Sequence, residues 1–256
     1  MESPKPSKRS ACRILVLVIA WGVGAGPVLW CLVVWIGGIT GPGHGARLAW
    51  ANLYNIRSLL SHYEELTGSL PLATGVDGGS PVSWRVATCA LWPFRTSNEL
   101  VGYDRTKPWN DTTNLRLESS GAWYFRYPEH ATEHLGRTGK YGRYATYYKA
   151  VTGPDTAFSS AQVSSDELPN SLVLVVQVER SDTHWMAPGD LSIEELTPTE
   201  QTKQLLLGRH GYGVLFRDGP WVLSAKTPIE DLCKFFTVIG AKAYDREQLL
   251  GPYRVR

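Results

Sequence analysis

The chain has 256 residues, a formal net charge of +2 and a hydrophobic content of 43%. This composition is typical of a globular protein that is large enough for one real core. The first 13 residues hold +3 of the charge, because four cations stand against Glu2, so the remainder carries −1. A near-neutral remainder lacks the basic surface that nucleic-acid binding needs, and we expect no nucleic-acid partner.

Residues 14–39 contain no charged side chain, and this run of 26 residues is the longest apolar feature of the chain. As a helix the run would be about 39 Å long, whereas a bilayer core is about 30 Å thick. A cleaved signal peptide is the alternative, but its apolar region is normally about 7–15 residues long. We therefore expect a basic cytoplasmic tail over 1–13 and a transmembrane helix over 14–39. This predicts a single-pass protein of the bacterial inner membrane, with its C-terminal part in the periplasm or its equivalent.

Residues 40–45 are rich in glycine and predict a linker to a domain over 46–256. A helix is expected from about Ala46 to Thr67, because apolar residues recur there every three or four positions. Gly68 is expected to end it. The apolar stripe of this helix is expected to pack on the protein's own core, and a filament or coiled-coil seam is the alternative.

Short strands are expected at 83–87, 123–127, 144–152 and 172–179. The pair Asp218-Gly219 lies between two apolar runs and predicts a β-hairpin. A C-terminal helix is expected from Thr227, as its N-cap, to Gly240. The predicted fold class is α+β: an N-terminal transmembrane helix, then a long amphipathic helix on an antiparallel β-sheet, with small helices near the C-terminus.

No established catalytic, phosphate-binding or dinucleotide-binding motif occurs in the chain, so we expect no catalytic, cofactor-binding or metal residues. His210 could be a ligand or base near Asp218, or simply a residue at the end of a strand beside a turn. His184-Trp185 with Asp190 could bind a ligand or form a packed loop.

Two further groups of residues could form a metal site or a disulfide. His130 and His134, with Glu133 between them, have the spacing of a helical metal site, but the surrounding glycines favour a loop. Cys89 and Cys233 are the cysteines that follow the apolar run. They could form one disulfide in an oxidising compartment or remain two buried thiols.

A series of short motifs from about Ala46 to Ser224 resembles a known family. They are Ser83-Trp84-Arg85-Val86, Tyr103-Asp104 with Pro108-Trp109-Asn110-Asp111, Phe125-Arg126-Tyr127-Pro128, Tyr147 to Val151 with Gly153-Pro154-Asp155, His184-Trp185-Met186 and Pro188-Gly189-Asp190-Leu191. Their shared order is similar to that of a pilin-like bacterial domain family of unknown function, abundant in planctomycete-type bacteria. That family carries a C-terminal His-x9-Asp-Gly motif, whereas seven residues separate His210 from Asp218 here.

The resemblance implies a pilin-like, non-enzymatic domain with a structural or partner-binding role at the cell envelope. Its motif positions in this chain are Trp84, Arg85, Pro108, Trp109, Gly153, Pro154, Trp185, His210, Asp218 and Gly219. The expected partners are the membrane and a protein at the cell envelope, and the oligomeric state is left open. One alternative is an anchored enzyme or metal-dependent ligand-binding protein that uses His184, His210 and Asp218. The other is a polymerising pseudopilin of a secretion or pilus system.

Overall fold

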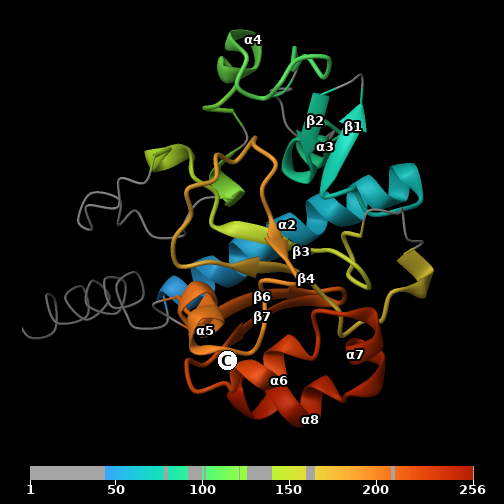
Figure 1. The fold of residues 1–256 in the computed structure, drawn as a ribbon, viewed down its shortest axis with the longest axis vertical. Helices are drawn as coiled ribbons and strands as arrows, with labels where there is room; N and C mark the ends of the chain where they lie inside the picture. The colour runs from blue at the N-terminus through green and yellow to red at the C-terminus, as the bar shows by residue number, and fades with distance from the viewer. Residues whose placement is uncertain are drawn as a thin grey trace, which may run out of the picture. The chain divides into compact units, whose positions relative to one another are not determined.

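The computed structural model describes residues 44–77, 80–91, 100, 102–120, 122–125, 140–159, 165–208 and 211–255. The chain from Gly45 onward forms one compact unit. It is α+β, with a five-stranded sheet, a separate two-stranded sheet and several short helices (Figure 1).

The longest helix of the described chain is α2 (His44–Thr67), with 24 residues. Its buried positions recur at spacings of three and four, at Ala49, Leu53, Ile56 and Leu60. The helix ends at Gly68, whose φ of +77° is readily adopted by glycine. The outward face is not uniformly polar, because Trp50, Tyr54 and Leu66 are 45%, 48% and 58% exposed. The expectation of a long amphipathic helix is therefore wrong, because the outward face carries large apolar and aromatic residues in addition to the buried stripe.

The main sheet has the strand order β5-β3-β4-β6-β7. Its strands are β3 (Tyr148–Thr152), β4 (Val173–Gln177), β5 (Leu191–Ser192), β6 (Tyr212–Phe216) and β7 (Gly219–Leu223). All neighbours are antiparallel except β3 and β5, which run parallel with Val151 opposite Leu191. The two-stranded sheet pairs β1 (Thr74–Asp77) with β2 (Ser80–Ser83). The prediction of one antiparallel sheet is thus wrong.

The two faces of the sheet are covered by different helices. Val222 of β7 forms a buried cluster with Ala46 and Ala49, so α2 lies on its face. Successive side chains of a strand point to opposite faces, and Trp221 accordingly packs with Phe216 on the other side. There the chain forms α6 (Ile229–Cys233), α7 (Val238–Ala243) and α8 (Arg246–Leu250), which gather beside β6 and β7 in Figure 1.

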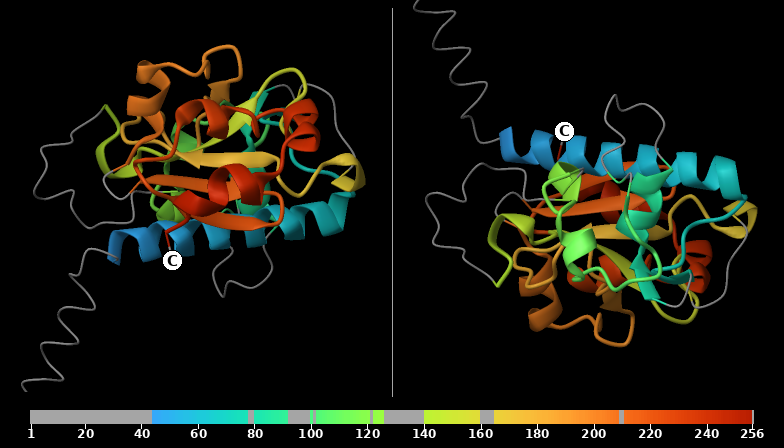
Figure 2. Two further views of the ribbon diagram at one scale, coloured as in Figure 1. Left: turned by 90° about the horizontal axis from the view of Figure 1, so that it is seen from below. Right: turned by 90° about the horizontal axis from the view of Figure 1, so that it is seen from above.

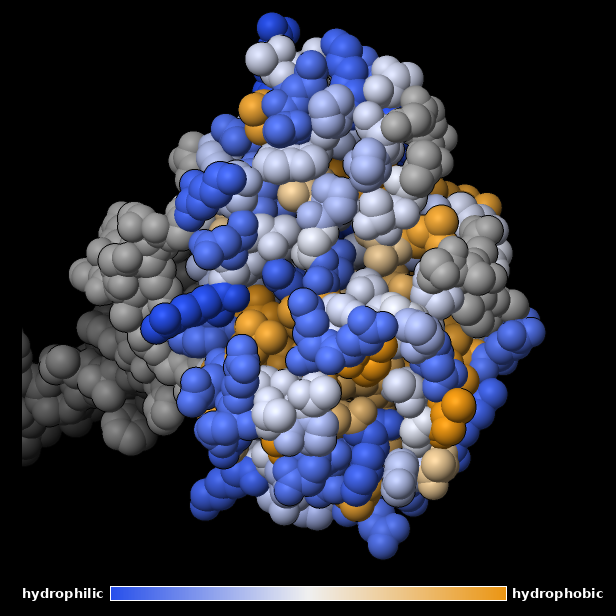
Figure 3. All heavy atoms as spheres, in the orientation of Figure 1, coloured by the Kyte–Doolittle hydropathy of each residue, from blue (hydrophilic) through white to orange (hydrophobic). Residues whose placement is uncertain are grey.

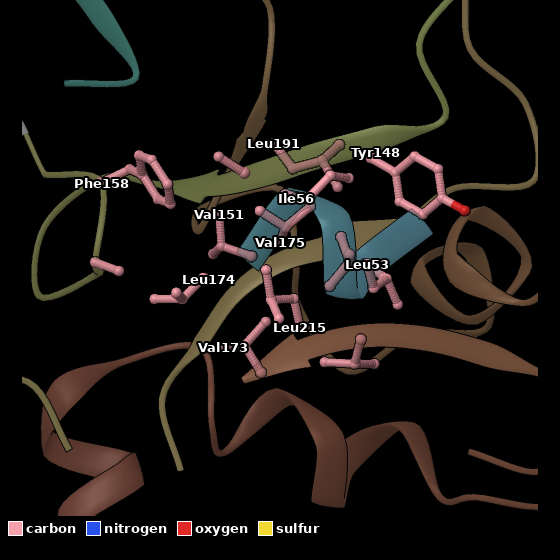
Figure 4. Close-up of a cluster of buried hydrophobic side chains, with 14 of the residues drawn as sticks. Leu53, Ile56, Tyr148, Val151, Phe158, Val173, Leu174, Val175, Leu191 and Leu215 are labelled. Carbon is pink, nitrogen blue, oxygen red and sulfur yellow. The ribbon is translucent and has the colours of Figure 1, made fainter. Parts of the chain in front are cut away.

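The centre of the core lies between α2 and the sheet (Figure 4). Leu53 and Ile56 meet Val173 and Val175 of β4 and Leu215 of β6, and all five side chains are fully buried. Burying a side chain of this size contributes about 1.5–3 kcal/mol. The helix and the middle strands therefore stabilise each other directly.

The remaining helices are short. They are α3 (Trp84–Ala90), α4 (Thr112–Leu115), α5 (Glu200–Leu206) and the 3-10 turns η1 (Ala122–Phe125), η2 (Gly142–Tyr144), η3 (Ser165–Glu167) and η4 (Gly251–Tyr253). Two expected strands are wrong here, because 83–87 opens α3 and 123–127 overlaps η1. Ser83 caps α3 by accepting a hydrogen bond from the Arg85 amide.

The expected C-terminal helix is two helices. Pro228, not Thr227, is the N-cap of α6, and the Thr227 hydroxyl instead donates to the Ser224 carbonyl. Gly240 lies inside α7, so it does not terminate the helix.

The membrane prediction requires a correction. No helix among the described residues has both the length and the apolar character needed to cross a bilayer. No described helix therefore supports the predicted single-pass arrangement or the inner-membrane localisation. The tail over 1–13 and the apolar run over 14–39 lie outside the described residues, and the last residues of the linker over 40–45 already belong to α2.

Candidate functional site

Arg85, one of the motif positions, is fully buried and surrounded by acceptors. Its Nη1 donates to Asp190 Oδ1 at 2.7 Å and to the Tyr148 carbonyl at 3.3 Å. Its Nε donates to the Trp185 carbonyl at 3.0 Å, and its Nη2 donates to the Ala187 carbonyl at 3.0 Å. A buried guanidinium needs this degree of hydrogen bonding. Arg85 thereby ties α3 to β3 and to the segment that precedes β5.

Asp190 completes this buried centre. Its Oδ1 also accepts from Trp84 Nε1 at 3.0 Å and from the Ala150 amide at 2.8 Å. The side chains of Arg85 and Asp190 are only 0% and 3% exposed. A carboxylate that is bound by three donors of its own chain and shielded from solvent is suited to holding the fold together.

The Pro108-Trp109 motif lies in a loop fastened by Asn114. The Asn114 Nδ2 donates to the carbonyls of Asp104 and Pro108, both at 3.0 Å, and its Oδ1 accepts from the Asp104 amide at 2.8 Å. The loop presents Trp109 to His184, with the two ring centroids 4.8 Å apart and nearly parallel. The motif thus builds a packed loop.

His184 is buried among aromatic rings. Tyr141 and Tyr144 flank it at centroid distances of 5.4 and 5.8 Å. Its Nδ1 accepts from the Met186 amide at 3.2 Å, and its Nε2 lies 3.6 Å from Glu118 Oε2. Burial, assisted by the positive charge of Arg85, lowers the His184 pKa to about 4. His184 is therefore a neutral, packed side chain at neutral pH.

Two more motif segments have a steric or packing role. Gly153 has a φ of +121°, and a Cβ there would lie 2.8 Å from Ile193 Cγ2, so a side chain is excluded just before Pro154. Trp185 is fully buried and donates from Nε1 to the Glu118 carbonyl at 2.9 Å.

The expected hairpin joins β6 to β7, but its turn is formed by Arg217 and Asp218, and Gly219 is the first residue of β7, opposite Phe216. Asp218 is bound at both oxygens by the Arg246 guanidinium, each at 2.7 Å. His184 pairs with Ala145, just before β3, and three strand spacings of about 4.8 Å separate β3 from β7. The structure therefore does not bring His184 and Asp218 together, and His210 lies outside the described residues.

The other expected groups are placed as follows. His130, Glu133 and His134 lie outside the described residues, and no metal-binding cluster of His, Cys, Asp or Glu occurs among the residues that are described. Cys89 of α3 and Cys233 of α6 are both half-buried, and no disulfide joins them. Burial raises the pKa of the Cys233 thiol to about 12, so it is not a reactive thiolate.

A groove of about 310 Å³ opens along the outer edge of β7, and we call it the β7 groove. It is lined by Trp50, Tyr54 and Arg57 of α2, by Asp218, Gly219, Pro220 and Trp221, and by Arg246, Glu247 and Arg254. In both views of Figure 2 the C-terminal segment, which carries Arg254, lies beside α2. That segment pairs with the second half of β7 through an Arg254–Leu223 bridge.

The aromatic side chains of the groove are prearranged. Trp50 and Tyr54 lie one helical turn apart and stack, with centroids 5.3 Å apart and an interplanar angle of 18°. Across the groove, the guanidinium groups of Arg246 and Arg254 each lie 4.3 Å from the centroid of the Trp221 ring. The groove therefore combines an exposed aromatic pair with stacked guanidinium groups.

Some charged side chains of the groove form ion pairs with each other, and others do not. Arg246 is occupied by Asp218, and Glu247 lies 3.9 Å from the same guanidinium. Within the described ranges, no carboxylate forms an ion pair with Arg57 or Arg254. Two cationic groups thus remain available to a ligand.

The sequence pointed to Asp218 and Gly219 but not to the arginine and aromatic residues around them. One signal was present: Trp50 and Tyr54 are large aromatic residues that fall off the apolar stripe of their helix. A bulky aromatic pair on the outward face of a helix has no role in the core.

Comparisons of the chain with protein families, with curated proteins and with solved structures find no match. The pilin-like resemblance accordingly remains a prediction.

Proposed function

We propose that this chain is a partner-binding domain and that the β7 groove is its recognition surface. The observation that carries this proposal is the stacked, exposed Trp50–Tyr54 pair beside the guanidinium groups of Arg57 and Arg254. Trp, Tyr and Arg are the residues most enriched at the energetic centres of protein interfaces. They bury a large area at a small entropic cost and offer both apolar and hydrogen-bonding contacts.

One face of the molecule offers a comparison. On the face shown in Figure 3, hydrophobic residues are scattered among polar ones. Scattered exposed hydrophobic residues are normal on any soluble surface. A stacked aromatic pair that lines a groove is different, because its exposure is concentrated at a concave site.

Photo-crosslinking in the native cell tests this function. A photoreactive phenylalanine analogue placed at Tyr54 should give a discrete covalent adduct with a partner, and Trp50→Ala should abolish it. The matched control is the same analogue at Leu66, which is also exposed on α2 but does not line the groove. The same adducts from both positions, or adducts that survive Trp50→Ala, would show that the groove is not the recognition surface.

A further inference from the structure

We infer that the partner segment bound in the β7 groove is an acidic peptide, with carboxylates on both sides of an apolar or aromatic side chain. This inference rests on the proposed function and specifies the chemistry of its ligand. It follows from the placement of the uncommitted guanidinium groups relative to the aromatic pair.

Charge complementarity is the first argument. Arg57 on α2 and Arg254 on the C-terminal segment line the groove on either side of the edge of β7, and neither is neutralised by a described carboxylate. Arginine binds carboxylates through two parallel hydrogen bonds, and such charge-assisted bonds are roughly twice as strong as neutral ones. A peptide with two separated carboxylates could satisfy both groups at once.

Preorganisation is the second argument. The Arg254 guanidinium lies over the buried Trp221 ring, 4.3 Å from its centroid, and this cation–π contact favours one position of the side chain. Because the side chain is already ordered, little conformational entropy is lost on binding. Trp50 and Tyr54 are stacked before any ligand arrives, and their exposed faces can accept an apolar side chain between the two carboxylates.

Other occupants fit less well. Pro220 lines the groove and has no amide hydrogen, so a strand that adds to this edge would lose a ladder bond. The basic first 13 residues of the chain would be repelled by Arg57 and Arg254. A nucleic acid needs an extended basic surface, and the chain beyond residue 13 carries no net positive charge to attract it.

Fluorescence anisotropy on the full chain tests the inference. The probe is a labelled pentapeptide with two glutamates on each side of a phenylalanine. We expect saturable binding that weakens as salt is added, because exposed ion pairs are screened. Arg57→Gln and Arg254→Gln should each weaken binding by about tenfold. Arg116→Gln, at an exposed arginine outside the groove, should leave it unchanged.

Matched peptides identify which side chains of the ligand the groove recognises. Replacing the four glutamates with glutamines should abolish binding, and replacing the phenylalanine with alanine should weaken it as strongly as Trp50→Ala does. No binding of the acidic peptide at millimolar concentration, equal binding of the glutamine peptide, or binding unaffected by Arg57→Gln and Arg254→Gln would each overturn the inference. So would a labelled single-stranded oligonucleotide that binds in place of the peptide.

The outcomes separate the two proposals. If the Tyr54 crosslink forms but the acidic peptide does not bind, the groove is a partner site of another chemistry and only this inference falls. If the Tyr54 and Leu66 adducts are the same, the proposed function itself falls.

Discussion

Arg85 is the residue whose removal should cost this fold most. Arg85→Met would leave the Asp190 carboxylate buried without its counter-charge, and breaking a buried pair in this way typically costs about 3–5 kcal/mol. We expect a loss of that size in the free energy of unfolding, measured by urea denaturation.

A double variant separates charge from packing. Arg85→Met with Asp190→Asn removes both charges but keeps an oxygen that can accept from Trp84 Nε1 and the Ala150 amide. We expect it to recover part of the lost stability, because no buried charge is then left unpaired. Arg116→Met, at an exposed arginine, should change stability by less than about 0.5 kcal/mol. A double variant less stable than Arg85→Met alone would contradict this account of the pair.

His184 should make stability depend on pH in mildly acidic solution. In the unfolded chain it takes up a proton near its ordinary pKa of about 6.5, whereas in the folded chain its pKa is lowered to about 4. Between these values the unfolded state binds more protons, so stability falls as pH falls through this window. The loss from His184 should approach about 3 kcal/mol.

The test is a comparison of unfolding free energies for the native chain and for His184→Phe at several pH values across that window. Phenylalanine keeps a ring against Trp109 but cannot titrate. The difference between the two proteins should therefore change with pH, and a constant difference would rule out His184 as the titrating group.

At the level of single residues, the sequence indicated several residues of the buried centre but not which residues they contact. Trp84, Arg85 and Trp185 stood in short motifs, and the structure brings them together. Trp84 and Arg85 donate to the Asp190 carboxylate, and Arg85 also donates to the Trp185 carbonyl. Arg85 and Asp190 are separated by 105 positions in the chain, and no local pattern connects them. Burial of an arginine cannot be read from its neighbours, because arginine is usually exposed.

Among the elements, the β6–β7 hairpin was predictable and is confirmed. The Asp-Gly pair indicated the hairpin, although the turn itself lies one residue earlier, at Arg217-Asp218. Pro220 is tolerated because it lies in an edge strand. The strand predicted at 83–87 is wrong. Three large residues after Ser83 resemble a strand in sequence, but Ser83 is the N-cap of the helix α3. The split of the C-terminal helix depends on Thr237, which caps α7 by accepting a bond from the Gly240 amide.

The contact between β6 and β7 should depend on Gly211, at the start of β6. Gly211 has a φ of +112°, and a Cβ there would collide with the Leu223 carbonyl. We expect Gly211→Ala to destabilise the domain by about 3 kcal/mol or more, through backbone strain and forced displacement of β7. Thermal unfolding would measure this loss.

Gly75 in β1 is the matched control. The nearest atom to a Cβ there would be the Val82 carbonyl oxygen at 3.9 Å, which is an ordinary contact. Gly75→Ala should therefore change stability by less than about 1 kcal/mol. Equal effects at Gly75 and Gly211 would contradict the steric argument.

For the whole molecule, the described residues of the two buried clusters run from Ala46 to Leu250, and the chain from Gly45 onward forms one compact unit. We therefore expect a fragment of residues 44–256 to fold alone and to unfold in one cooperative transition. Near-ultraviolet circular dichroism and thermal unfolding, compared with the full chain, would check this. A fragment without near-ultraviolet signal, or with a broad transition, would show that the core needs the residues before α2.

The α+β class could be predicted from the mixture of helical and alternating patterns, but the topology could not. The parallel pairing of β3 with β5 joins Val151 to Leu191, and β5 has only two residues, too few for a pattern. Hydropathy alone led to the membrane assignment, which the described helices do not support. Pairing over long separations depends on contacts such as Arg85–Asp190, which sequence periodicity does not encode.

The packing of the first helix against the last strand has a consequence for synthesis on the ribosome. The apolar stripe of α2 is made early, but Val222, its partner in β7, emerges more than 150 residues later. At about 5–20 residues per second, Leu53 and Ile56 would wait roughly six to twenty-four seconds for Val173 and Val175 of β4, and Ala46 and Ala49 would wait longer for Val222. The nascent chain should therefore be a client for chaperones during that interval, and its yield should fall when they are depleted.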